Sequence, residues 1–123
     1  MAYEVTIRET NLELTARERI RLKDTTDSIK LDERTRLGDV IITPKGYAIL
    51  DVHNDKGDDK DYTQYLVIDN DDTKYLTGSN SFWSSFKAIF DEMVGETEEY
   101  QVKAYRVPSK NYKDKDFITC SII

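Results

Sequence analysis

One strongly helical segment limits the folds open to this chain. Between residues 82 and 93, apolar side chains recur every three or four positions, as they do on one face of an α-helix. They are Phe82, Phe86, Ile89, Phe90 and Met93. Serines at 79 and 81 offer an N-cap before the segment, and Gly95 offers a stop after it. The sequence therefore predicts a helix over 81–94.

Runs of β-forming residues flank this helix on both sides. They predict three or four strands before it, from the runs at 39–43, 47–53, 62–69 and 74–77, and two after it, at 100–105 and 117–123. Pro44-Lys45-Gly46 predicts a tight turn between the first two runs, and residues 70–72 predict another turn. This order predicts a mainly β fold: a five-stranded antiparallel barrel of the oligonucleotide-binding (OB) type over 38–123, with the helix between strands 3 and 4. A mixed α+β sheet with one packed helix is the alternative.

Residues 1–37 are expected to form an N-terminal extension that packs on the barrel or extends it. Alternation of Tyr3, Val5 and Ile7 with polar residues predicts a short strand. Thr15 and Glu18 have the spacing of a capping box, which predicts a helix toward residue 23. The same stretch also alternates as a strand would, with four cations on one face: Arg17, Arg19, Arg21 and Lys23. The sequence alone leaves both possibilities open.

The formal charge of −6 is unevenly distributed. Residues 1–37 carry eight cations and eight acids, and residues 38–98 carry five cations and thirteen acids. Residues 99–123 carry five cations and three acids. Proteins that coat nucleic acid without sequence preference are usually basic, so the total charge disfavours that role. The basic segment 99–123 still allows a nucleic-acid-binding role, because the local field over a binding surface matters more than the net charge of the whole chain.

Several properties argue for a cytoplasmic protein with no membrane partner. No apolar run approaches the roughly 20 residues of a membrane-spanning helix. The N-terminal residues lack the charged and apolar regions of a signal peptide. The one cysteine, Cys120, alternates with Ile118 and Ile122, which predicts a buried and unreactive thiol.

Nothing in the sequence singles out a catalytic or metal centre. His53 is the one histidine, so no His/Cys cluster for a transition metal can form. The acidic stretches at 55–61 and 70–72 lack the calcium-loop pattern. There is no glycine-rich phosphate loop, and no carboxylate pair stands out among the 24 acids. We expect no enzymatic activity, no cofactor and no metal.

The segment from Lys103 to Lys115 is basic and contains two tyrosines, Tyr105 and Tyr112. Its five cations are Lys103, Arg106, Lys110, Lys113 and Lys115. Cations bind phosphates and exposed aromatic rings stack on unpaired bases, so this predicted hairpin is a candidate finger for binding single strands. The alternative is a solvated hairpin whose lysines protect a sheet edge.

Two tyrosines on the middle β-runs are further candidates. Tyr47 and Tyr65 would lie on the strands that form the binding face of a barrel. Strand alternation allows only one of Tyr62 and Tyr65 to point outward alone, and we expect it to be Tyr65. Packing in the core or at an edge is the alternative for each ring.

The elements over 38–123, with the strand Glu99-Tyr-Gln-Val-Lys-Ala-Tyr-Arg-Val, a Ser/Lys-rich turn and the closing strand Asp116-Phe-Ile-Thr-Cys-Ser-Ile, resemble small single-stranded-DNA-binding proteins of tailed phages. In that family a Tyr/Phe-x-Val-Lys strand leads into a Ser/Lys/Gly tip. The resemblance implies an OB barrel that coats replication intermediates in the host cytoplasm, protects them from nucleases and removes hairpins. The binding residues it implies, carried over by position, are Lys103, Tyr105, Arg106, Lys110, Tyr112, Lys113 and Lys115, with Tyr47 and Tyr65 on the face.

Two features depart from this family. Residues 1–37 have no counterpart in the minimal barrel, and Ser121-Ile122-Ile123 is strand-like where bacterial relatives carry an acidic tail that recruits partners. We expect a non-catalytic, largely sequence-independent single-stranded-DNA-binding protein of phage or mobile-element replication or recombination. Its expected partners are single-stranded DNA, replication or recombination proteins and further copies of itself. The alternative is an acidic protein-interaction module, for instance a nucleic-acid mimic facing a basic partner.

Overall fold

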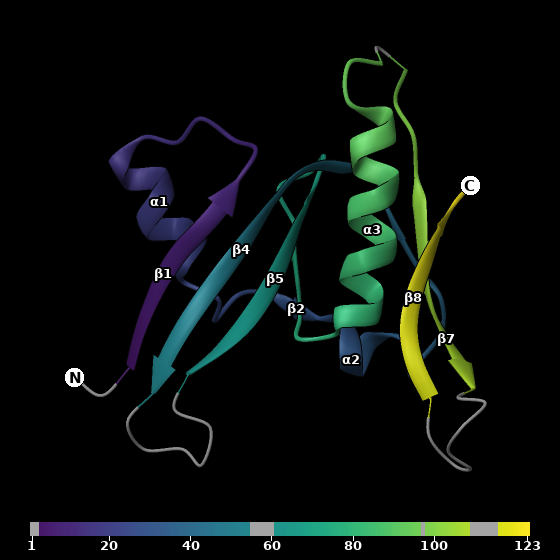
Figure 1. Ribbon diagram of the computed structural model, residues 1–123, viewed down its shortest axis with the longest axis horizontal. Coiled ribbons are helices and arrows are strands. Elements are labelled where there is room, and N and C mark those ends of the chain that lie inside the picture. Colours follow the sequence, from purple (N-terminus) through teal and green to yellow (C-terminus); the bar gives the residue numbers. More distant parts are fainter. Residues whose placement is uncertain (1–2, 55–60, 97, 109–115) are drawn as a thin grey trace. The chain divides into compact units, whose positions relative to one another are not determined.

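The computed structural model describes residues 3–54, 61–96, 98–108 and 116–123. The elements in chain order are β1 (Tyr3–Thr10), α1 (Ala16–Lys23), β2 (Ile29–Lys30), α2 (Leu31–Arg34), β3 (Val40–Ile42), β4 (Pro44–Asn54), β5 (Asp61–Asp69), β6 (Lys74–Thr77), α3 (Asn80–Met93), β7 (Val102–Pro108) and β8 (Asp116–Ile122) (Figure 1). Strands make up 47% of the structure and three helices are described with them, so the fold is mixed α/β with mostly strands. The chain divides into two compact units. Unit 1 comprises Met1–Ile29 and Lys45–Gly78, and unit 2 comprises Lys30–Pro44 and Ser79–Ile123.

The strands form two open sheets, ordered β1-β4-β5-β6-β2 and β3-β7-β8, and the described residues contain no closed barrel. The predicted tight turn at 44–46 is wrong. Pro44 and Gly46 lie within β4, and β3 pairs with β7 instead of folding back on β4. Gly46 lets the Leu12 side chain pack closely on β4, since a Cβ at position 46 would lie 2.8 Å from that side chain. The glycine that suggests a turn is therefore a packing position on an extended strand.

Unit 1 builds its core on one face of the five-stranded sheet. The buried cluster consists of Leu22, Ala48, Leu50, Leu66, Ile68 and Leu76, with Val5, Ile7, Leu12 and Leu14 packed against it. The predicted N-terminal strand is present as β1, which pairs antiparallel with β4. The predicted turn at 70–72 joins β5 to β6, and the amide of Asp72 donates to Asp69 O at 2.9 Å.

Helix α1 shows that the capping-box interpretation of residues 15–23 is correct and the strand alternative is wrong. The Thr15 hydroxyl accepts from the Glu18 amide at 3.2 Å, and the Glu18 carboxylate accepts from the Thr15 amide at 3.0 Å. The hydrogen bond from the Thr15 amide favours the charged carboxylate and so lowers the pKa of Glu18. Together the two hydrogen bonds satisfy two otherwise unpaired amides at the helix start.

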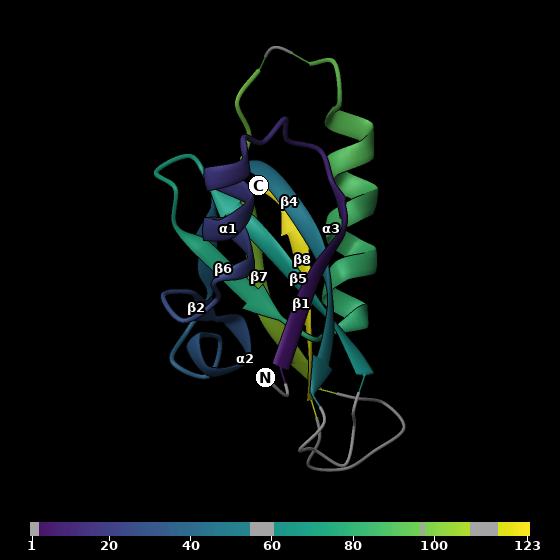
Figure 2. The same ribbon diagram turned by 90° about the vertical axis from the view of Figure 1, so that its left-hand side faces the viewer.

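Lys74 on β6 holds the other end of α1, and Figure 2 labels both of these elements. Its ammonium donates to Arg21 O at 2.9 Å and to Asp24 O at 2.6 Å, and it pairs with Asp27 Oδ1 at 2.8 Å. Carbonyls at a helix C-terminus lack partners within the helix and carry partial negative charge, so a cation is the matching ligand. The Lys74 side chain is only 12% exposed, and it ties the helix to the sheet.

Unit 2 combines α3 with the three-stranded sheet. The β7–β8 hairpin expected from the sequence is present, with Val102 opposite Ile122 and Pro108 opposite Asp116. One face of the sheet is buried through Val40, Ile42, Val102, Ala104, Ile118 and Cys120. Burial raises the pKa of the Cys120 thiol to about 12, as expected for an unreactive cysteine.

Helix α3 matches the prediction for residues 81–94 closely. The Ser79 hydroxyl accepts from the Phe82 amide at 3.2 Å as the N-cap, and Gly95 follows the helix at φ +90°. Phe82 and Phe86 are fully buried. The helix also lies against the edge strand β8, where the Ser81 hydroxyl donates to Ile118 O at 2.8 Å and satisfies a carbonyl. No helix in the described part of the chain is both long and apolar enough to cross a membrane.

Replacing Lys74 with methionine should destabilise the protein by about 2 kcal/mol, because the Arg21 and Asp24 carbonyls lose a charged donor in a largely buried place. Urea unfolding followed by circular dichroism measures the change. Lys45→Met is the matched control, since Lys45 forms an exposed ion pair with Asp72 and should cost less than about 1 kcal/mol. Equal losses for the two variants would contradict the capping role.

Candidate nucleic-acid interface

The face of the three-stranded sheet opposite its buried face is the candidate site. Antiparallel partners share a face, and neighbours along a strand alternate. The register therefore places seven side chains together, none of them buried: Ile41, Lys103, Tyr105, Val107, Phe117, Thr119 and Ser121. We call this set the outer face. Part of its apolar surface is exposed to solvent, since Ile41 is 45% and Phe117 is 40% exposed.

Lys103 and Tyr105, both expected from the sequence to bind, lie side by side on the outer face. The Lys103 ammonium lies 5.3 Å from the centre of the Tyr105 ring, which is cation–π distance. The Tyr105 hydroxyl is 2.7 Å from the Ser121 hydroxyl, so the ring is held at its polar end. Asp39 approaches the ammonium only to 4.0 Å, and the Lys103 side chain is 43% exposed. The pair therefore combines a positioned aromatic ring with an accessible cation.

Phe117 and Ile41 are the members of this face that sequence reasoning missed. Phe117 is opposite Val107 in the β7–β8 register, and Ile41 is opposite Lys103 in the β3–β7 register. The alternation of Phe117 with the buried Ile118 was visible in the sequence. The partner of residues 40–42 was not, because β3 pairs with a strand about 60 residues further along the chain.

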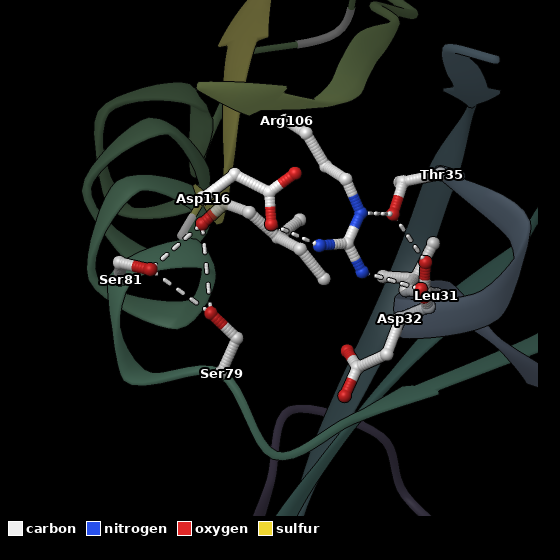
Figure 3. Close-up of polar contacts among 8 residues, drawn as sticks. Leu31, Asp32, Thr35, Ser79, Ser81, Arg106 and Asp116 are labelled. Carbon is white, nitrogen blue, oxygen red and sulfur yellow. Dashed lines mark hydrogen bonds and ion pairs between the residues drawn. The ribbon is translucent and has the colours of Figure 1, made fainter. Parts of the chain in front are cut away.

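Arg106 lies on the opposite side of β7 and has a structural role there (Figure 3). Its Nε donates to Thr35 Oγ1 at 3.1 Å, one terminal nitrogen donates to Asp32 O, and the other pairs with Asp116 Oδ1 at 2.6 Å. Thr35 in turn donates to Leu31 O at 2.7 Å. The Arg106 side chain is 17% exposed, so it links β7 to α2 and β8. This placement does not fit the expectation that Arg106 contacts a phosphate.

The two tyrosines expected on the binding face belong to unit 1 and are not part of the outer face. Tyr47 is 6% exposed, and its hydroxyl donates to Glu9 Oε2 at 2.8 Å. Its burial and its hydrogen bond agree with the alternative interpretation, in which the ring packs inside the fold. Tyr65 is half-buried on the face of β5 that carries Thr63, whereas Tyr62, on the face that carries Leu66 and Ile68, is 36% exposed at the start of the strand.

The other predicted binding residues, Lys110, Tyr112, Lys113 and Lys115, lie outside the described residues. Their segment joins Pro108 at the end of β7 to Asp116 at the start of β8. The acidic stretch 55–60 is also outside them. Next to it, His53 Nδ1 and Asp61 Oδ1 are 2.6 Å apart. Within the ranges that are described, no group of three or more His, Cys, Asp or Glu side chains could hold a metal ion.

Comparisons with family models, curated proteins and solved structures found no match. The net negative charge of the chain is unequally divided between the two units. Unit 1 carries nine cations and fourteen acids, whereas unit 2 carries nine cations and ten acids. Most of the negative charge therefore belongs to the unit that does not contain the outer face.

Arg106→Ala should lower the free energy of unfolding by about 2–3 kcal/mol, because it leaves Asp116 and the α2 carbonyl without a charged donor. Arg106→Lys should recover only part of this loss, since an ammonium cannot reproduce the forked geometry. Lys103→Ala, an exposed cation on the same strand, should cost less than about 1 kcal/mol. Thermal and urea unfolding measure all three. An Arg106→Ala variant of wild-type stability would show that Arg106 does not hold unit 2 together.

Proposed function

We propose that this protein binds single-stranded DNA without catalysis, through the outer face of the β3-β7-β8 sheet. The observation that carries the proposal is the grouping of Tyr105, Phe117 and Lys103, none of them buried, on one face of the sheet. Open sheets that present aromatic rings are a common platform for unpaired bases. A closed barrel is not required for this mode of binding, so the two open sheets do not count against it.

Base stacking supplies the selectivity for single strands. The flat faces of unpaired bases are free to stack on Tyr105 or Phe117, whereas bases in a duplex already stack on one another. Every base has such a face, so the binding is largely independent of sequence. The half-exposed Val107 and the exposed Ile41 extend the apolar surface around the two rings.

Phosphate contacts supply the salt-dependent part of the affinity. Lys103 is the described cation on the outer face, and it can exchange its weak contact with Asp39 for a phosphate. The sequence places Lys110, Lys113 and Lys115, with Tyr112, in the segment that joins the two strands of the hairpin. These four residues belong to the proposal through their position in the chain.

The resemblance to phage single-stranded-DNA-binding proteins supports a more specific role. By that resemblance, the protein coats single-stranded intermediates of phage or mobile-element replication or recombination in the host cytoplasm, and replication or recombination proteins are its partners. An OB-like arrangement of the strands over 38–123 belongs to the same proposal.

The charge of unit 1 favours a second candidate function. With fourteen acids against nine cations, unit 1 can present an acidic surface to a basic protein, as nucleic-acid mimics do. Single-stranded-DNA cellulose at low salt separates the two candidates. A binder is retained and elutes with salt, whereas a mimic flows through.

Tyr105→Ala and Phe117→Ala should each weaken binding to a labelled oligo-dT of about 30 nucleotides by roughly tenfold, because each removes a stacking platform. Lys103→Ala should weaken binding less and reduce the slope of log affinity against log salt by about one. Fluorescence anisotropy at low and high salt measures both effects. Tyr62→Ala, an exposed tyrosine of unit 1, is the matched control and should bind as the wild type does.

Duplex competitor completes the test. The wild type should stay bound to oligo-dT in the presence of excess duplex of equal length, since the duplex offers no free base faces. Absence of binding at low salt would refute single-strand binding. Equal losses for Tyr62→Ala and Tyr105→Ala, with folding intact, would remove the outer face from the proposal.

A further inference from the structure

Strand β1 leaves a long edge of the five-stranded sheet unpaired. It is the terminal strand in the order β1-β4-β5-β6-β2, and among the described strands it pairs with β4 alone. Its eight residues present a row of backbone donors and acceptors on the other side. Such an edge is a template for pairing with another strand.

The first part of this edge has little of the usual protection against pairing, since Glu4 is its one charged side chain. Residues 4–7 contain neither proline nor lysine, and the register shift in the β1–β4 pairing falls only after Ile7. Val5 and Ile7 are half-buried, although their β4 partners Val52 and Leu50 are 2% and 0% exposed. The apolar core of unit 1 is therefore incomplete along this strand.

The sequence of β1 is complementary to itself in one antiparallel register. With Thr6 opposite Thr6 of a second copy, Glu4 lies opposite Arg8, and Val5 lies opposite Ile7, each contact occurring twice. Paired residues share a face, so the two charges meet on one side and the apolar side chains meet on the other. A register centred on Ile7 would instead place Val5 against Glu9. The match is specific to the register centred on Thr6.

We propose that two copies of this chain associate through antiparallel pairing of β1 with β1, with Thr6 on the two-fold axis. The partner is thus a second copy, and its chemistry is fixed by the Glu4–Arg8 and Val5–Ile7 contacts. Arg8 can serve both its own chain and the partner. Its Nε donates to Asp51 Oδ2 at 3.0 Å, its side chain is 55% exposed, and a guanidinium has five N–H donors. This association is independent of the proposed DNA binding.

The interface is short, so the dimer should be weak. Pairing about five residues per copy buries less than the roughly 1,200 Å² of a stable interface. We expect a dissociation constant in the micromolar range or above. Concentration-dependent sedimentation is therefore expected for the wild type. A fixed mass at all concentrations up to about a millimolar would contradict the proposal.

Cysteine cross-linking tests the register directly. Opposite Cα atoms of an antiparallel pair lie about 4.5–5.5 Å apart, which suits a disulfide. Thr6→Cys should therefore become a covalent dimer under mild oxidation. Native Cys120 should not interfere, because it is buried and its pKa is raised to about 12. Glu4→Cys is the matched control, since its two copies would lie roughly 13 Å apart along the strands and should not cross-link alone.

Mixing separates specific pairing from random collision. Glu4→Cys mixed with Arg8→Cys should cross-link, because residue 4 of one copy faces residue 8 of the other. Cross-linking of Glu4→Cys alone as fast as Thr6→Cys would overturn the register. Absence of cross-linking for Thr6→Cys at concentrations where the wild type dimerises would overturn the interface.

A charge reversal gives a second, non-covalent readout. Glu4→Arg creates two like-charge contacts across the axis and should raise the dissociation constant tenfold or more, a magnitude expected for cross-strand pairs. Glu13→Arg makes the same charge change outside β1 and should leave association unchanged. Equal sedimentation of Glu4→Arg and wild type would contradict the pairing, and thermal unfolding checks that each variant is folded.

Discussion

The pairing of β7 with β8 is the constraint on which unit 2 and its proposed function depend. Because side chains alternate along paired strands, one register decides the side of every residue in the hairpin. Ala104 and Cys120 face the core, whereas Lys103, Tyr105 and Phe117 face outward. A shift by one residue would bury the lysine and expose the core. The Arg106 contacts to α2 and Asp116 fix β7 to its neighbours and so help to fix this register.

Much of the fold could be predicted from local patterns in the sequence. The Thr15–Glu18 capping box and the Ser79 cap were readable because their partners are within three residues. The division into two sheets was not readable, because Pro44-Lys45-Gly46 has the composition of a turn. Only the approach of Leu12 to Gly46 shows why an extended strand needs a glycine there.

The candidate site, like the fold, could be predicted from the sequence only in part. Lys103 and Tyr105 were identified because both lie on one continuous basic strand. The structural contacts of Arg106 could not be predicted, because Thr35, its hydrogen-bond partner, is 71 residues away. The hydrogen bond of Tyr47 could not be predicted for the same kind of reason, since Glu9 is 38 residues away. An acidic chain that binds DNA is physically consistent when the outer face lies on the nearly neutral unit, because the local field over a surface matters more than the total charge.

Backbone amide NMR with a short oligo-dT at low salt tests the central claim most directly, because it reports where the strand lies. We predict that the perturbed amides cluster at Ile41, at 103–107 and at 117–121. The β1, β4 and β5 amides of unit 1 should change little. Perturbations centred on unit 1, or none at oligo-dT concentrations up to a millimolar, would contradict the assignment of the outer face as a single-strand-binding surface.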